Sequence, residues 1–562
     1  MWSDPVGGLG LPFSWSVSGG KGMHATLIKV LGVAFLACSA AASPPTLGQR
    51  AARCIEADRL GEAEALLTRL LAEDDRASTY ALLGRLRQRC GDPVGALHAF
   101  RRALDRRADC LEARLGGAEC WLALKETKRA ARLAGEIRRE RPATPRAWAV
   151  EIRALIDQGR LDRAWELSTR SLEVCAEPGA LLFQVRGAVL FRRRRIKEAA
   201  ANYLFSLDLP GDHLEAHTRL GGGFLPSPGG EMGKEIRRGL AALERGAIGE
   251  ALTLLDRAAA GSRRDPMAHR LLSLALRSRR RRFSFLASHP AARALARSIE
   301  EPAPGPAAAA LFPAYSRLDP VRRRVIDRVV AAWAPYMDRL LARGGRHDLL
   351  ALGERTTDAP QRASLRGART ADGRYWDSVR GLGGLVSATG VENLDEAARF
   401  GFNTLAHEVT HQVHLYAMSP AEQRRIQQLY RQARKEGRCL DYYAATCPAE
   451  YFAQGFEAFL SLAKVAGCRR TQGHTRFELR RRDPELERFL RARTAWDPLA
   501  GPRGKERLRA AARVALVTGR FQDVEEAVAL MGEKADAGAR ELVSRARSGR
   551  EWFREGATTA TP

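Results

Sequence analysis

A regular spacing of small residues runs through the first half of the 562-residue chain. Ala96, Ala130 and Ala164 are 34 residues apart, and the next match, Ala199, comes one residue late. Residues 45–285 show helical periodicity almost throughout, with little β-branched alternation. A fixed period of this length favours stacked units that each bury one face against the next. The first half is therefore predicted to be an α-solenoid.

Small and large positions recur at fixed offsets within the units. Offsets 0, 12, 16 and 19 are occupied by Gly84, Ala96, Phe100 and Ala103, by Gly187, Ala199, Tyr203 and Ser206, and by Gly239, Ala251, Leu255 and Ala258. We expect the small residues where the two helices of a unit cross closely and the large ones in the gap to the next unit. The pattern resembles the tetratricopeptide repeat family, with roughly six units, Ala118 in place of an expected glycine and an interruption at 221–233. The resemblance implies a surface that holds a peptide or protein partner, and a generic α-solenoid is the alternative.

A change of pattern predicts a second domain. Five prolines between residues 298 and 320 break the helical periodicity, and we predict a linker over 286–320. The next domain, 321–500, is expected to be α+β with a small sheet, including a strand within 383–390. A shorter helical echo predicts a C-terminal helical hairpin in 501–550. The expected fold class is thus mainly α, a helical solenoid followed by an α+β domain.

The segment AHEVTHQVH at 406–414 carries the strongest chemical signal. It lies in a stretch, 394–418, that is predicted to be one helix, so His407 and His411 are side by side one turn apart. Two imidazoles in this arrangement can grip one tetrahedral metal ion, and Glu408 can reach a water on that ion. This is the HExxH motif of zincins, and the alternative is a helix with polar histidines facing solvent. His414 lies about 10 Å from His407 along the helix axis, so it is not expected to bind the same ion. His414 could lie beside the site, face the substrate or be a surface residue.

A third ligand is expected from a second helix that begins near Pro448. Glu450, Gln454 and Glu457 share one face of this helix. A carboxylate at Glu450, 39 residues after His411, would complete a His-His-Glu site with one open position. Such a donor set suits zinc.

HEVTH, then a tyrosine, then AEYFAQGFEAF resembles the gluzincin peptidases of the anthrax lethal factor type. The resemblance implies that Glu450 is the third zinc ligand. It implies that Tyr443 assists catalysis by a hydrogen bond to the developing oxyanion, with Tyr442 as the fallback. Gln454 departs from the acidic residue often found at its position. The implied activity is that of a zinc metalloendopeptidase with one Zn²⁺ ion and Glu408 as general base, acting on a peptide or protein substrate. The predicted strand near 383–390 could hold that substrate by edge addition.

The net charge of the chain indicates which partners it could attract. A net charge of +27 could attract nucleic acid or an anionic envelope surface. The basic runs lie in helix-like stretches without a nucleic-acid module, which favours solvated helix faces and disfavours nucleic acid.

From Met23, a basic start, an apolar stretch and small residues predict a signal peptide within 1–42, and hence export to the periplasm, the cell surface or the medium. Lipid attachment at Cys38 is disfavoured because Phe35 and Leu36 fit that motif poorly. In an exported protein, Cys439–Cys447 or Cys447–Cys468 would be plausible disulfides.

Two other classes of function remain open. The chain could be a non-catalytic repeat scaffold that carries a vestigial peptidase fold, or a polyanion binder. Loss of His411 would abolish metal binding and proteolysis in an enzyme, whereas it would leave partner binding intact in a scaffold. A polyanion binder would show steep salt dependence that zinc removal does not change.

Overall fold

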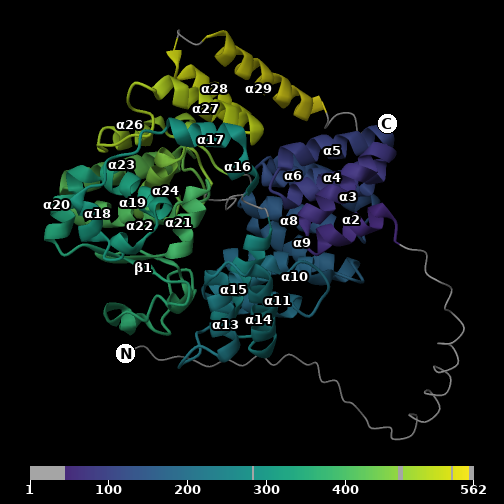
Figure 1. Cartoon of the computed structure of the whole chain (residues 1–562), viewed down its shortest axis with the longest axis horizontal. Coiled ribbons are helices and arrows are strands. Elements are labelled where there is room, and N and C mark those ends of the chain that lie inside the picture. The colour runs from purple at the N-terminus through teal and green to yellow at the C-terminus, as the bar shows by residue number, and fades with distance from the viewer. Residues whose placement is uncertain (1–44, 281–283, 466–472, 533–535, 556–562) are drawn as a thin grey trace, which may run out of the picture. The chain divides into compact units, whose positions relative to one another are not determined.

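A computed structural model describes residues 45–280, 284–465, 473–532 and 536–555. The predicted signal peptide, Cys38 and Cys468 lie outside these residues. The described chain is mainly helical, with helix pairs in its first half and one small mixed sheet in its second (Figure 1). Within these residues, no helix combines the length and apolar character needed to cross a membrane.

The first half is built from antiparallel helix pairs, as predicted. The pairs are α2 (Leu47–Glu56) with α3 (Leu60–Glu73), α4 (Ala77–Arg89) with α5 (Pro93–Arg106), α6 (Leu111–Ala123) with α7 (Thr127–Glu140), α8 (Pro145–Asp157) with α9 (Leu161–Val174), α10 (Gly179–Arg192) with α11 (Ile196–Ser206), and α13 (Lys234–Glu244) with α14 (Ile248–Gly261). Short turns join the two helices of each pair, so each pair buries its apolar stripe against its neighbours.

The repeated offsets have a direct packing explanation. A Cβ atom at Gly84 would collide with the Phe100 ring, which lies 16 positions later in the paired helix. A Cβ at Gly187 would lie 2.9 Å from Tyr203 Cε2, again 16 positions later. Glycine is therefore required where the large residue of the second helix lies directly against the first helix.

The predicted interruption is present between α11 and α13. α12 (Leu214–Arg219) runs into a π-helical turn, η1 (Leu220–Phe224), inside which Gly222 and Gly223 leave the helical backbone conformation. Gly223 has φ +99°, a conformation that favours glycine, and its carbonyl accepts a hydrogen bond of 2.7 Å from the Tyr375 amide. The solenoid thus departs from its period where it contacts a loop of the second domain.

The region predicted to be a linker contains short helices. α17 (Pro290–Ser298) packs against α27 (Gly504–Val517). The other helices outside the repeat pairs are α15 (Pro266–Arg279), α16 (Ser284–Ser288), α18 (Pro306–Leu311), α19 (Pro320–Ala332), α20 (Ala334–Ala342), α21 (Val391–Ala398), α22 (Thr404–Gln412), α23 (Pro420–Lys435), α24 (Pro448–Leu460), α25 (Arg476–Arg482), α26 (Pro484–Arg491), α28 (Phe521–Ala529) and α29 (Ala537–Glu555). The region predicted to be a C-terminal hairpin, 501–550, contains α27 and α28 and most of a third helix, α29.

The sheet has three strands in the order β1-β3-β2. β1 (Arg346–Leu350) runs parallel to β3 (Val386–Gly390), and β2 (Gly381–Leu382) runs antiparallel to it. The strand expected within 383–390 therefore exists as β3, but it is the central strand. The expectation that a substrate peptide adds to the edge of this strand is wrong, because β3 pairs with β1 on one side and with β2 on the other.

The prediction of a single helix over 394–418 is also wrong, because a turn after Ala398 separates α21 from α22. α21 ends at Ala398, and Phe400 takes the left-handed conformation with φ +63°. A Cβ at Gly401 would lie 2.6 Å from the Glu396 carbonyl oxygen, so the turn needs glycine there. α22 then starts afresh, and the histidine helix has its own capped N-terminus.

Candidate metal centre

The start of α22 is fixed by buried polar contacts to α24. The Asn403 side chain accepts a hydrogen bond of 3.0 Å from the Ala406 amide and caps the helix. The backbone amide of Asn403 donates a hydrogen bond of 2.9 Å to Glu457 Oε1. The same carboxylate pairs with Lys464, whose Nζ donates to the Gly401 carbonyl at 2.9 Å. The two helices that carry the candidate ligands are therefore tied together where α22 begins.

Trp333 packs between the same two helices. Its fully buried ring stacks on Phe456 of α24 with centroids 4.4 Å apart. Its Nε1 donates a hydrogen bond of 3.3 Å to the Thr410 hydroxyl, which lies inside the HExxH segment of α22. Because a buried aromatic ring tolerates little displacement, Trp333 helps to set how α22 and α24 cross.

Three side chains from α22 and α24 converge at this crossing. His407 Nε2 lies 3.1 Å from His411 Nε2 and 3.0 Å from Glu450 Oε2. His411 Nε2 lies 3.6 Å from the same carboxylate oxygen. Both imidazoles are buried, and Glu450 is partly buried. The group could hold a metal ion, and it contains the three residues that the sequence predicted as ligands.

The donor set and its spacing fit zinc. A tetrahedral ion with bonds of about 2.0–2.2 Å separates its ligand atoms by about 3.3–3.6 Å. The three separations here, 3.0, 3.1 and 3.6 Å, are close to the edges of one face of such a tetrahedron. Two imidazole nitrogens and one carboxylate also match the protein ligands of catalytic zinc sites, which leave a fourth position open.

Protonated His407 and ionised Glu450 stabilise each other. Burial opposes a proton on His407, but the hydrogen bond and charge of Glu450 outweigh burial and raise the pKa of His407. Burial likewise opposes a charged Glu450, but His407 and His411 outweigh it and hold the pKa of Glu450 below its usual range. A proton on His407 must therefore leave before a metal ion can bind there.

Glu408 lies beneath a glycine segment at the start of β2. A Cβ atom at Gly381 would lie 2.5 Å from Glu408 Oε1, and one at Gly383 would lie 3.5 Å from Glu408 Oε2. Burial raises the pKa of Glu408 above its ordinary value. A carboxyl with a raised pKa is suited to accept and release a proton near neutral pH. The glycines thus leave room for a buried acid beside the two histidines.

Of the two adjacent tyrosines, Tyr443 contacts the ligand group. Its hydroxyl donates a hydrogen bond of 3.0 Å to Glu450 Oε1. Burial and the charge of Glu450 raise the pKa of Tyr443, so the phenol stays protonated at neutral pH. Tyr442 is exposed, and the Arg192 guanidinium lies 3.3 Å from its ring centroid. The geometry favours Tyr443 over Tyr442 as a hydrogen-bond donor in the site.

His414 is neither a member of the ligand group nor a surface residue. Its ring is buried and packs edge-on against Phe452, with centroids 5.2 Å apart. Burial lowers the pKa of His414 to about 4, so the ring is neutral at physiological pH. The residue lies in a π-helical turn, η6 (Val413–Ala417), that directly follows α22.

A histidine that sequence reasoning missed supports the histidine helix from the sheet. His347 of β1 is fully buried, with Nδ1 2.9 Å from Gln412 Oε1 and Nε2 2.9 Å from the Thr389 hydroxyl. Gln412 also donates to the Leu385 carbonyl at 2.8 Å. These contacts join β1, β3 and the end of α22. No local sequence pattern indicates these contacts, because the partners lie 42 and 65 positions from His347.

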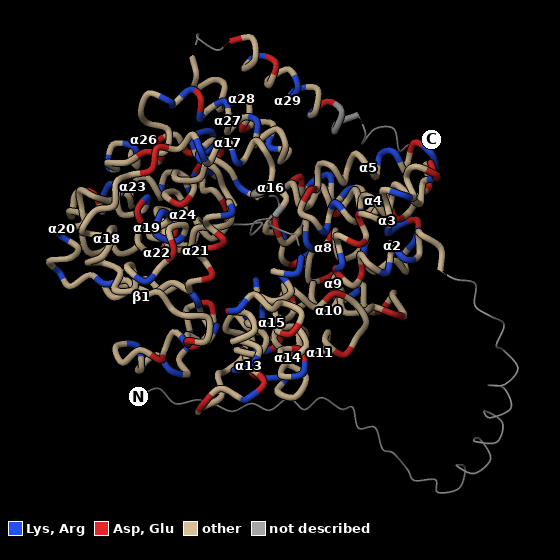
Figure 2. The backbone as a smooth tube through the Cα atoms, viewed as in Figure 1, with Lys and Arg blue, Asp and Glu red and all other residues tan. Residues whose placement is uncertain are grey.

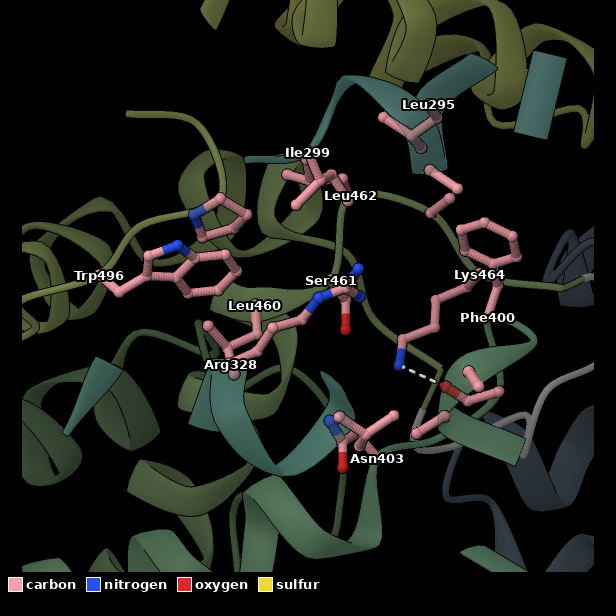
Figure 3. Close-up of a pocket in the computed structure, with 17 residues that line it drawn as sticks. Leu295, Ile299, Arg328, Phe400, Asn403, Leu460, Ser461, Leu462, Lys464 and Trp496 are labelled. Carbon is pink, nitrogen blue, oxygen red and sulfur yellow. Dashed lines mark hydrogen bonds between the residues drawn. The ribbon is translucent and has the colours of Figure 1, made fainter. Parts of the chain in front are cut away.

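A separate cavity of about 110 Å³ lies beside the start of α22 (Figure 3). Phe400, Asn403, Lys464 and Trp496 are among the residues that line it, and the bond from Lys464 to the Gly401 carbonyl crosses one side. Its lining includes none of the three ligand residues. Pockets that enclose small-molecule ligands are usually about 300–1,000 Å³, so this space is too small for a peptide.

Comparison with known proteins identifies the repeats. A tetratricopeptide repeat family model matches residues 91–151, which covers α5, α6, α7 and about the first half of α8. The chain contains a tetratricopeptide repeat region. No curated protein matches the chain. The match is confined to residues 91–151 and does not reach the HExxH segment, so it supports a repeat region and says nothing about the metal centre.

Solved structures of repeat proteins are also similar to this chain. A tetratricopeptide repeat protein of Thermus thermophilus is 17% identical, with a TM-score of 0.28, and the match covers 31% of this chain and 94% of that one. PilF of Pseudomonas aeruginosa is 14% identical, with a TM-score of 0.26, and coverage of 38% and 89%. A tetratricopeptide repeat protein of Parabacteroides merdae is 14% identical, with a TM-score of 0.28, and coverage of 41% and 83%.

Proposed function

We propose that the chain is a zinc-dependent metallopeptidase whose ion is held by His407, His411 and Glu450. The observation that carries the proposal is the convergence of these three ligand atoms within 3.6 Å of one another. Glu408 and Tyr443 lie beside them, as the resemblance to gluzincin peptidases implies. One position of a tetrahedral ion would remain open for chemistry.

The side chains of this site supply the proton transfers and the oxyanion contact. Zinc, when bound, would lower the pKa of a water molecule and polarise a peptide carbonyl. Glu408 takes up a proton from the attacking water at its carboxylate and returns it to the leaving amine. Tyr443, protonated at neutral pH, donates a hydrogen bond to the oxygen on which negative charge develops.

The position of β2 supports a binding mode for the peptide. In the described part of the chain, β2 pairs with β3 on one side only. An extended peptide could add to its other edge through backbone hydrogen bonds, which would give affinity with little sequence preference. Gly381 of β2 lies directly over Glu408, so such a peptide would pass close to the general base.

Metal content and cleavage of a peptide library test the proposal. The purified protein should contain about one zinc, and His411→Ala and Glu450→Ala should lose both metal and cleavage. Glu408→Gln should keep the metal and lose at least about 100-fold in kcat. His98→Ala, in helix α5, is the matched control for loss of a histidine. A protein that takes up no zinc after reconstitution would overturn the proposal.

The repeat region supports a second function in the same chain. Tetratricopeptide repeats stack into surfaces that bind peptides or partner proteins. We propose that the repeats bind a protein, either the substrate or a regulator of the peptidase. If the metal centre proves inactive, partner binding that survives His411→Ala would identify the chain as a repeat scaffold.

Polyanion binding has less support. Acidic and basic positions are interspersed along the same helices (Figure 2). Arg146, for example, pairs with both Glu112 and Glu119. This function would be favoured if the protein bound DNA or anionic vesicles with an affinity that falls steeply with salt and does not change when zinc is removed.

Export remains a proposal that rests on the sequence from Met23. A basic start, an apolar stretch and small residues are typical of a signal peptide. The N-terminal residue of the mature protein, determined by sequencing after expression in a bacterium, tests it. Cleavage near residue 42 would support export, whereas a retained Met23 segment would contradict it.

A further inference from the structure

The loop that carries Tyr443 is held by one aspartate. Asp441 Oδ1 accepts hydrogen bonds of 2.8 Å from the backbone amides of Tyr443 and Ala444. An aspartate that binds the amides two and three positions later fixes the backbone of a tight turn. Tyr443 lies on irregular backbone before α24, so its hydroxyl position depends on this turn and not on a helix.

The other oxygen of Asp441 is bound by a buried histidine. His474 Nε2 lies 3.1 Å from Asp441 Oδ2, and His474 Nδ1 lies 3.0 Å from Glu478 Oε2. The side chains of His474 and Asp441 are 4% and 7% exposed, so both are shielded from water. An imidazole between two carboxylates can serve both only when each of its nitrogens carries a proton. Burial opposes that form, but Glu478 and Asp441 outweigh burial and raise the pKa of His474.

Other parts of the chain hold His474 in place. Lys125, from the turn between α6 and α7, donates a hydrogen bond of 3.1 Å to the Gly473 carbonyl. Arg520, from the turn between α27 and α28, donates to the same carbonyl at 2.8 Å and lies 3.7 Å from Glu478. These two cations lie beside the cluster and connect it to the tetratricopeptide repeat region and to the C-terminal helices.

We propose that Asp441 and His474 are positioning residues for Tyr443. Asp441 sets the turn, and His474 holds Asp441 in the orientation that the turn needs. The inference rests on the proposed function, because it concerns the hydrogen bond that Tyr443 donates during peptide hydrolysis. Catalytic donors must be held within about 0.5 Å of the productive position, and a donor on a loop reaches that precision only through supporting contacts.

Steady-state kinetics of zinc-loaded variants test the inference. Asp441→Ala and His474→Gln should lower kcat by about 10- to 100-fold, and no further than Tyr443→Phe does. KM and zinc content should remain close to those of the parent, because neither residue touches a metal ligand. Asp441→Asn keeps an oxygen that can accept both amide protons, so it should recover most of the activity.

A double variant separates positioning from mere stabilisation. In the Tyr443→Phe background, Asp441→Ala should cost no further activity, because the hydroxyl that it positions is already gone. Asp319→Ala removes a similar contact, from the Asp319 side chain to the amides of Val321 and Arg322 at the start of α19, and should leave kcat unchanged.

Three results would overturn the inference. One is full activity in both Asp441→Ala and His474→Gln. Another is an equal loss of kcat from Asp441→Ala in the parent and in the Tyr443→Phe background, which would show a general structural role. Either result in an active, zinc-loaded parent leaves the proposed function standing. A parent that binds zinc but cleaves no peptide overturns the proposed function and this inference together.

Discussion

At the scale of single residues, the metal centre depends on atoms that must approach closely. His407, His411 and Glu450 bring their ligand atoms together because α22 and α24 cross tightly. Glu408 is buried beside them under a segment that has glycine where any side chain would intrude. The GLGGL segment, residues 381–385, is therefore part of the site although none of its side chains takes part in chemistry.

Gly381→Ala should impair catalysis without removing the metal. The new Cβ would lie 2.5 Å from Glu408 Oε1 and 2.9 Å from Thr404 Cγ2, so Glu408 must move. Displacing a general base costs about 10²- to 10⁴-fold in rate, and we expect kcat to fall by at least about 100-fold while zinc content stays near one. Gly222→Ala is the control, since a Cβ there meets open space. Unchanged kcat in Gly381→Ala would contradict this account of the glycine.

His347 should make the fold sensitive to acid. Burial lowers its pKa in the folded protein to about 4, against about 6.5 when unfolded. The unfolded chain therefore binds more protons between these values, and the free energy of unfolding falls as the pH drops from about 6.5 to about 4. Thermal melting of the parent and of His347→Asn, which does not titrate, should show their difference shrinking over this range. A difference that is constant with pH would refute the assignment.

At the scale of elements, the repeat pairs show how one glycine fixes a helix crossing. Phe100 of α5 lies against Gly84 of α4 and also against Gly116 of α6. One large ring thus fills the space between two successive first helices of the solenoid. The repeated offsets placed Phe100 in the gap to the next unit, where it meets Gly116, and the structure adds its contact with Gly84 of its own unit.

Gly84→Ala should destabilise the repeats. The added methyl group would collide with the Phe100 ring, and overpacking of this kind costs about 1–3 kcal/mol of the free energy of unfolding. Urea denaturation followed by circular dichroism measures the loss. Adding Phe100→Leu should recover part of it by relieving the collision. A stabilised Gly84→Ala, as expected for a helical glycine without neighbours, would contradict the packing.

At the scale of the whole molecule, an ion-pair network joins distant parts of the repeat region. Arg280, just after α15, donates to Asp58 in the turn after α2 at 2.6 Å and to Asp212 at 2.8 Å. Arg89, the last residue of α4, donates to Asp212 at 2.8 Å. A solenoid normally has contacts only between successive units, whereas this network connects residues up to 222 positions apart.

Asp58→Ala should weaken the repeats as a whole. The Asp58 side chain is 2% exposed, so its loss leaves the buried Arg280 with Asp212 as its remaining acidic partner. Removing one partner of a buried pair costs about 3–5 kcal/mol, and the remaining partner should reduce the cost to about 2 kcal/mol. The urea midpoint of the parent and the variant measures it. Asp109→Ala, in an exposed pair with Arg107, should change the midpoint very little.

The sequence by itself determined the local features of this protein. Helical periodicity and the 34-residue spacing predicted the repeat pairs, because both depend on contacts within about one unit. The placement of His407 and His411 followed from the pitch of a helix. Their convergence with Glu450, expected from spacing and resemblance, is present in the structure.

Only the tertiary structure decided what lies around these residues. The break at Phe400, the central position of β3, and the contacts of Trp333, His347 and Asp441 depend on elements far apart in the chain. Such contacts carry no period in the sequence, since their partners are chosen by how helices and strands pack and not by neighbours along the backbone. The ligands could therefore be predicted, whereas the residues that hold them in place had to be seen.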